Sequence, residues 1–96
     1  MSRIYLNDLH KGDHSIVIGF NLERAYDQAQ AQNLEDRLLE MGFEEGLPVE
    51  VLHEGPVSRD PMAVRLGRVI VALRRNEAAI IEVTKAQQAA SEQEKA

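Results

Sequence analysis

The sequence of 96 residues predicts a mainly β domain with one or two helices. Short runs of alternating apolar and polar residues, bounded by Gly and Pro, recur between residues 14 and 83, which is typical of strands joined by turns. A leucine repeat at helical spacing lies between residues 33 and 42. A chain of this length forms one domain with a small core.

The first predicted strand covers residues 14–20 and follows a turn at residues 9–13. Three large apolar side chains alternate along it, and this alternation predicts a largely buried face. These side chains are Ile16, Ile18 and Phe20, with Val17 on the opposite face.

The segment 21–33 is polar, rich in Ala and Gln, and free of Gly and Pro. Because its apolar face is thin, we expect this insertion to be either a mobile connection or a loosely docked helix. A better helix is expected to begin at Asn33, which is a good N-cap residue. We expect Gly42 to end this helix in the left-handed conformation, with Phe43 folding back onto Leu38.

Four further short strands are predicted after the helix, at residues 48–52, 62–66, 69–73 and 80–83. Three connections join these strands. They are a loop bounded by prolines at 55–61, a Gly-first turn at Gly67–Arg68 and a polar turn at 74–79. Five short strands joined by tight turns remove their edges by closing on themselves. We therefore expect a small five-stranded SH3-like barrel over residues 1–84, with a disordered tail at 85–96.

Composition excludes several classes of function. A net charge of −5, from 11 basic and 16 acidic residues, argues against nucleic-acid binding. Cysteine is absent, which excludes disulfides and thiolate metal sites. No apolar run approaches the roughly 20 residues of a membrane span, and the N-terminus lacks a secretory signal. We expect a cytoplasmic protein that does not insert into the membrane.

The sequence has neither a phosphate-binding Gly-Lys-Ser/Thr loop nor a recognisable nucleophile turn, so we do not expect an enzyme. The candidate metal ligands are His10, His14 and His53, with Asp13, Glu50 and Glu54 as nearby carboxylates. A turn between the first two histidines does not suit chelation. We interpret all three as exposed polar residues, which leaves a weak divalent transition-metal site at most and no required cofactor.

Charged residues near expected turns and on the exposed helix face are the candidate contacts to a partner protein, since loops on a rigid scaffold often carry such contacts. They are Arg37, Glu40, Arg59, Asp60, Arg74 and Arg75.

Five motifs occur in a fixed order along the chain: Leu9–Gly12, Leu39–Phe43, Gly46 with Val49 and Val51, Gly55–Pro61, and Leu73–Ala78. This order resembles the FeoA family, small cytoplasmic accessory proteins of bacterial ferrous-iron uptake. The resemblance implies an SH3-like barrel that docks on FeoB, a membrane transporter with a cytoplasmic GTP-binding domain, and modulates transport or that domain. It also implies a location peripheral to the inner membrane. The segment 22–32 is longer than the family link, and the tail after 85 is additional.

Two other functions stay open. The first is a metal-responsive binding protein that uses its histidines; a related barrel forms the C-terminal domain of some metal-dependent repressors, but this chain lacks a helix-turn-helix. The second is a structural module that forms a homo-oligomer by pairing an open edge strand with a second copy.

Overall fold

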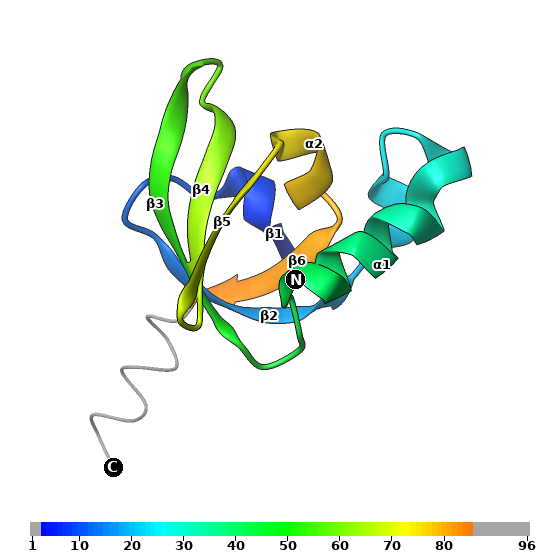
Figure 1. Cartoon of the computed structure of the whole chain (residues 1–96), viewed down its shortest axis with the longest axis horizontal. Helices are drawn as coiled ribbons and strands as arrows, with labels where there is room; N and C mark the ends of the chain where they lie inside the picture. Colours follow the sequence, from blue (N-terminus) through cyan, green and yellow to red (C-terminus); the bar gives the residue numbers. More distant parts are fainter. Residues whose placement is uncertain (1–2, 86–96) are drawn as a thin grey trace.

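The computed structural model describes residues 3–85, and within them six antiparallel strands form one sheet in the order β1-β6-β2-β3-β4-β5 (Figure 1). The strands are β1 (Ile4–Tyr5), β2 (His14–Phe20), β3 (Pro48–Val57), β4 (Asp60–Leu66), β5 (Val69–Leu73) and β6 (Ile81–Lys85). Two α-helices, α1 (Ala31–Met41) and α2 (Arg75–Ala78), accompany three short 3-10 helices. The predicted mainly β class is confirmed.

The predicted number of strands was one too low. The additional strand is β1, which pairs with β6 through Ile4 opposite Val83 and Tyr5 opposite Glu82. Two residues are too few for an alternating pattern to be recognised in a sequence. In the described part of the chain, β1 and β5 stand at the two ends of the sheet, so hydrogen bonding does not close it.

The buried face of β2 differs from the prediction. Ser15 and Val17 are fully buried, whereas Ile18 is 42% exposed. The pairing register between β2 and β6 shifts between Val17 and Gly19. Such a bulge adds one residue to a strand and breaks the alternation of its faces. Val17 before the bulge and Phe20 after it therefore both contact the core.

The polar segment 21–33 is partly helical, but it is not one docked helix. It holds 3-10 helices at Leu22–Arg24 and Gln28–Gln30, and α1 follows from Ala31. The N-cap expected at Asn33 was wrong, because this residue lies inside α1 and its side chain donates to Gln30 Oε1 at 2.8 Å. Ala and Gln are good helix formers, so the helix starts two residues earlier.

The C-terminal end of α1 is as predicted. Gly42 has a φ of 112° and donates to the carbonyl of Leu39 at 3.0 Å. The next amide, of Phe43, donates to the carbonyl of Leu38 at 3.1 Å. This pair of bonds ends a helix in the left-handed conformation and returns the chain to the core, where Leu38 and Phe43 are fully buried.

The loop predicted at 55–61 is instead part of a long hairpin. β3 continues to Val57 and β4 begins at Asp60, joined by Ser58 and Arg59 with φ of 55° and 58°. Two central residues with positive φ make the turn that fits strand twist. The prolines are tolerated because one stands at the start of β4 and the other at an irregular stretch of β3.

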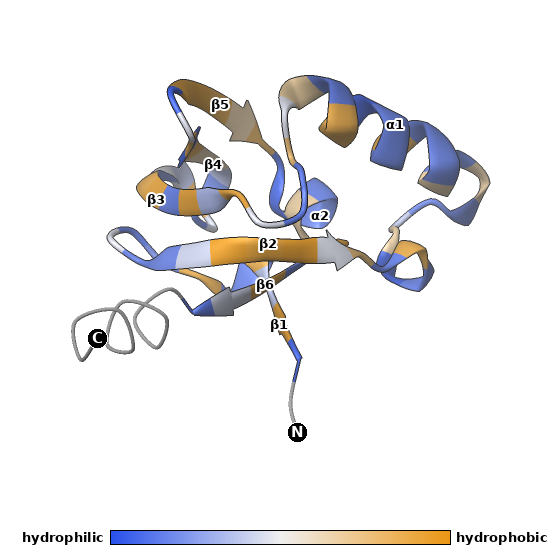
Figure 2. Ribbon diagram, turned by 90° about the horizontal axis from the view of Figure 1, so that it is seen from below, coloured by the Kyte–Doolittle hydropathy of each residue, from blue (hydrophilic) through white to orange (hydrophobic). Residues whose placement is uncertain are grey.

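The core lies between the curved sheet and the helices, and apolar residues recur along the strands that enclose it (Figure 2). On β4, the alternating residues Met62, Val64 and Leu66 are all buried. β6 runs from Ile81 to Lys85 rather than from 80 to 83, and the rest of the predicted tail lies outside the described residues. Within residues 3–85, no helix is both long enough and apolar enough to cross a membrane.

Candidate functional site

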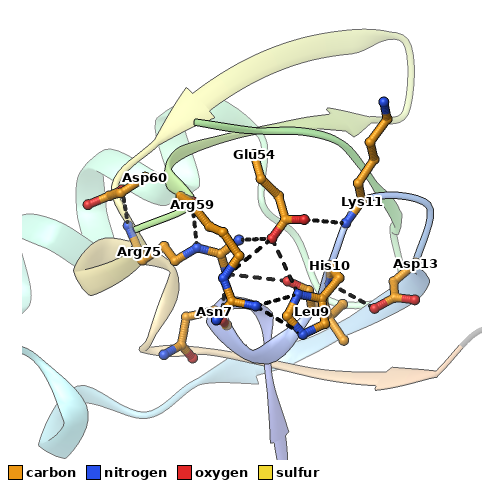
Figure 3. A network of polar contacts seen from close by, with 9 residues as sticks. All are labelled: Asn7, Leu9, His10, Lys11, Asp13, Glu54, Arg59, Asp60 and Arg75. Carbon is orange, nitrogen blue, oxygen red and sulfur yellow. Dashed lines mark hydrogen bonds and ion pairs between the residues drawn. The ribbon is translucent and has the colours of Figure 1, made fainter. Parts of the chain in front are cut away.

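Five charged or polar side chains and one backbone amide, that of Lys11, come together near the tip of the β3–β4 hairpin (Figure 3). They come from the turn before β2, from β3, from the hairpin turn, from the start of β4 and from the start of α2. We call this group the Glu54 cluster; it consists of His10, Lys11, Glu54, Arg59, Asp60 and Arg75.

Arg75 is the centre of the cluster. Its side chain is only 15% exposed, and it donates to Glu54 Oε1 at 2.6 Å. It also donates to the carbonyls of Asn7 at 2.7 Å, Leu9 at 3.3 Å and Arg59 at 2.7 Å. One guanidinium thus joins the N-terminal segment, β3 and the hairpin turn, which makes Arg75 a structural anchor. Its contact with a partner stays a prediction.

Glu54 is held as a carboxylate. The amide of Lys11 donates to its Oε2 at 3.1 Å, and His10 Nδ1 lies 3.3 Å from Oε1. The hydrogen bond from the Lys11 amide lowers the pKa of Glu54, burial opposes this, and the neighbouring His10 and Arg75 lower it further. The carboxylate charge is thus balanced within the cluster.

Arg59 links the tip of the hairpin to the turn before β2. Its Nη1 lies 2.9 Å from His10 Nδ1. The neighbouring Asp60 accepts from the amide of Arg75 at 3.0 Å. These contacts fix the hairpin but leave the Arg59 side chain 59% exposed.

The histidines do not form a metal centre. His10 shares Glu54 with Arg75 and Lys11, and His14 Nε2 stands 3.8 Å from Glu50 Oε2. His53 is exposed on β3. No three His, Asp or Glu side chains gather to hold an ion anywhere in residues 3–85. Pairs of ligands already bonded to arginine or backbone do not fit a resident metal.

A second candidate site is a groove of about 270 Å³ between α1 and α2, which we call the α1–α2 groove. Arg37 of α1 and Arg74, just before α2, both line it, together with Leu34, Tyr26 and Glu77. Arg37 pairs with Glu77, and Glu77 also accepts from the amide of Arg74 at 2.7 Å.

The structure thus divides the six predicted contact residues. Three join the Glu54 cluster and two line the α1–α2 groove, while Glu40 is exposed on α1 away from both. Sequence reasoning missed Tyr26, which lines the groove and is 87% exposed. A lone aromatic residue in the polar segment 21–33 was the available signal.

Comparison with known proteins places the chain in a family. The FeoA domain model matches residues 4–85. A relative from Porphyromonas gingivalis, a fusion of Fe(2+) transport protein A with the Fe(2+) transporter FeoB, is 35% identical over 78 residues. The match covers 81% of this chain but only 8% of the length of that relative.

Solved structures agree in fold. FeoA from Stenotrophomonas maltophilia, a prokaryotic SH3 domain protein complexed with zinc, is 30% identical with a TM-score of 0.67, covering 83% of this chain and 88% of that one. FeoA from Chlorobium tepidum is 29% identical with a TM-score of 0.67, covering 85% of this chain and 70% of that one. The predicted SH3-like fold is therefore confirmed, with six strands in place of five. From the matched family model and the fusion relative together, the chain belongs to the FeoA family of ferrous iron transport.

Proposed function

We propose that this chain is a cytoplasmic accessory protein of ferrous iron uptake that docks on a FeoB-type membrane transporter or its GTP-binding domain. The observation that carries the proposal is the P. gingivalis fusion, in which a region 35% identical to this chain shares one polypeptide with FeoB. Domains that are fused in one protein commonly act on each other. The fusion therefore supports an association between this chain and a separate FeoB-type transporter.

The proposed action is binding without catalysis. A bound protein modulates a transporter by stabilising one of its conformations, which requires contacts that differ between those conformations. The α1–α2 groove offers such contacts through Arg37 and Arg74, which line it. Arg59 and Asp60 on the hairpin and Glu40 on α1 are further proposed contacts. Arg75 holds the β3–β4 hairpin in place through its bonds to Glu54 and to the carbonyl of Arg59.

The experiment measures retention of the transporter. Detergent-solubilised membranes that contain the FeoB-type transporter from the same genome are passed over the immobilised protein, with and without GTP. We expect retention of the transporter, and slower ferrous iron uptake by cells in which this chain is deleted. Absence of retention in every nucleotide state, together with unchanged uptake after deletion, would contradict the proposal.

A second candidate function, transition-metal binding, is favoured by the zinc complex of the S. maltophilia relative. The described residues do not supply a ligand set for it, since the pairs around Glu54 and Glu50 are also bonded to arginines. Calorimetric titration with Zn(II) and Fe(II) separates the two proposals. Tight one-to-one binding that is lost on substitution of His10, His14 or His53 by Ala would favour metal binding.

A further inference from the structure

The edge strand β5 exposes apolar residues. Val69 is 54% exposed and Ile70 is 61% exposed, although both belong to a run of five apolar residues from Val69 to Leu73. β5 stands at the end of the sheet and, among the described strands, pairs with β4. Exposed apolar edge strands are uncommon in soluble domains because they attract other strands.

The main chain of this edge has free hydrogen-bonding groups. Leu66 and Val69 flank the two-residue turn, so they form the first hydrogen-bonded pair between β4 and β5. Hydrogen-bonded and non-bonded pairs alternate along antiparallel strands. Val71 and Leu73 therefore bond to β4, while the amides and carbonyls of Ile70 and Ala72 point away from it. We call these four outward groups the free edge.

The free edge leads into the α1–α2 groove. Arg74 follows the last residue of β5 and lines that groove. Both ribbon views show α1 beside β5, on the side away from β3 (Figures 1 and 2). A segment that pairs with β5 would therefore end near Arg74 and Arg37.

Two arginines without an ion pair among the described residues flank the free edge. Four of the 11 basic residues of the chain, and none of its 16 acidic residues, lie within residues 65–75, although the net charge is −5. Arg75 is turned inward and Arg65 pairs with Glu50 at 2.9 Å. Arg68 and Arg74, one at each end of β5, form no ion pair with any carboxylate of residues 3–85.

We propose that an extended, acidic segment of the partner protein adds to the free edge of β5 as a further strand of the sheet. This inference deepens the proposed function, because it names the docking surface and the chemistry of the docked segment. Main-chain bonds to Ile70 and Ala72 supply affinity, and carboxylates that reach Arg68 and Arg74 set the register.

A second copy of this chain fits the same edge less well. The antiparallel register that uses the free groups of both copies places Ile70 opposite Ala72. The same register places Arg68 opposite Arg74 of the other copy at each end. Like charges directly opposite each other across paired strands are destabilising.

The experiment compares variants for retention of the FeoB-type transporter and follows amide exchange by NMR. Arg68→Glu with Arg74→Glu reverses both free charges, and Ile70→Pro removes one outward amide without breaking a bond to β4. Lys85→Glu, an exposed reversal on β6, is the matched control. Urea unfolding of each variant establishes that it folds.

We expect the double charge reversal to retain at least about tenfold less transporter, because two attractive contacts become repulsive. Ile70→Pro should also bind less, whereas Lys85→Glu should match the original protein. Exchange at Ile70 and Ala72 should slow when the transporter is bound. Equal retention by all variants would overturn the inference and leave the proposed function standing.

If the original protein retains no transporter in any nucleotide state and deletion leaves iron uptake unchanged, the proposed function fails, and a synthetic probe then tests the inference alone. A short peptide of alternating glutamate and valine should slow exchange at Ile70 and Ala72, and a lysine–valine peptide of the same length should not. Equal effects of the two peptides, or no effect of either, would overturn the inference. So would slow exchange at these amides in dilute free protein, or a dimer in sedimentation that protects them.

Discussion

The two adjacent arginines after β5 allow a matched test of how the hairpin is held. Arg75→Met keeps an apolar stem but removes the guanidinium that joins three segments. Arg74→Met makes the same chemical change at an exposed neighbour whose side chain has no ion pair within residues 3–85. The two variants therefore differ in position and not in chemistry.

The expected size of the effect follows from the contacts of Arg75. Its side chain donates to three backbone carbonyls, those of Asn7, Leu9 and Arg59, and is 15% exposed. A hydrogen bond contributes about 0.5–1.5 kcal/mol net, so Arg75→Met should lower the free energy of unfolding by about 3 kcal/mol. Arg74→Met should change it by less than about 0.5 kcal/mol, as is usual at exposed positions.

Urea unfolding followed by circular dichroism measures both free energies at pH 7. For a domain of this size, a loss of about 3 kcal/mol also lowers the melting temperature by roughly 12–24 °C. Equal unfolding midpoints for the two variants would refute the assignment of Arg75 as the anchor of the hairpin. A larger loss for Arg74→Met would reverse the roles of the two residues.

Three further predictions concern stability. Gly42→Ala should destabilise the fold by about 1–2 kcal/mol, because φ is 112° and the new Cβ would lie 3.3 Å from Leu66 Cδ2, whereas Gly19→Ala meets open space; equal melting temperatures would contradict this. Because the pKa of Glu54 is lowered from 4.5 in the folded protein, its stabilising effect is present above that value and is lost as the pH falls through the lowered one. In Glu54→Gln, the urea unfolding midpoint should fall less steeply as the pH is lowered. An unchanged dependence of the midpoint on pH would show that another group causes the loss of stability in acid. Ser15→Ala should be neutral or slightly stabilising in thermal unfolding, since the buried hydroxyl has no hydrogen-bond partner within residues 3–85; a clear loss would reveal a bond to it.

The sequence predicted those elements whose signals are local. The end of α1 needs only Gly42 in the left-handed conformation and Phe43 returning to Leu38, and both are as expected. The turn at Gly67–Arg68 likewise depends on a glycine that adopts positive φ, here 63°. Capping and turn rules act over four or five residues, so a single sequence is sufficient to apply them.

The errors arose where distant strands determine the local structure. The bulge between Val17 and Gly19 is a property of the pairing between β2 and β6, and the one local signal for it, the isolated Gly19 within the strand, does not fix the register shift. The hairpin tip was read as a loop because of its two prolines. In the folded protein, Pro56 lies in an irregular stretch of the pairing between β3 and β4, and Pro61 lies at the start of β4. The turn itself is made by Ser58 and Arg59.

The sequence predicted that Arg74 and Arg75 belong to the candidate site, but not that they lie in different parts of it. The difference arises from the course of the main chain after Leu73. In the sequence, Arg74 and Arg75 are adjacent residues of the same type within the same predicted turn. The start of α2 rotates the second side chain towards Glu54 and the carbonyl of Asn7, while the first lines the α1–α2 groove. One arginine thereby becomes part of the framework that fixes the β3–β4 hairpin. The other is left beside the free edge of β5, where its charge can select an acidic segment.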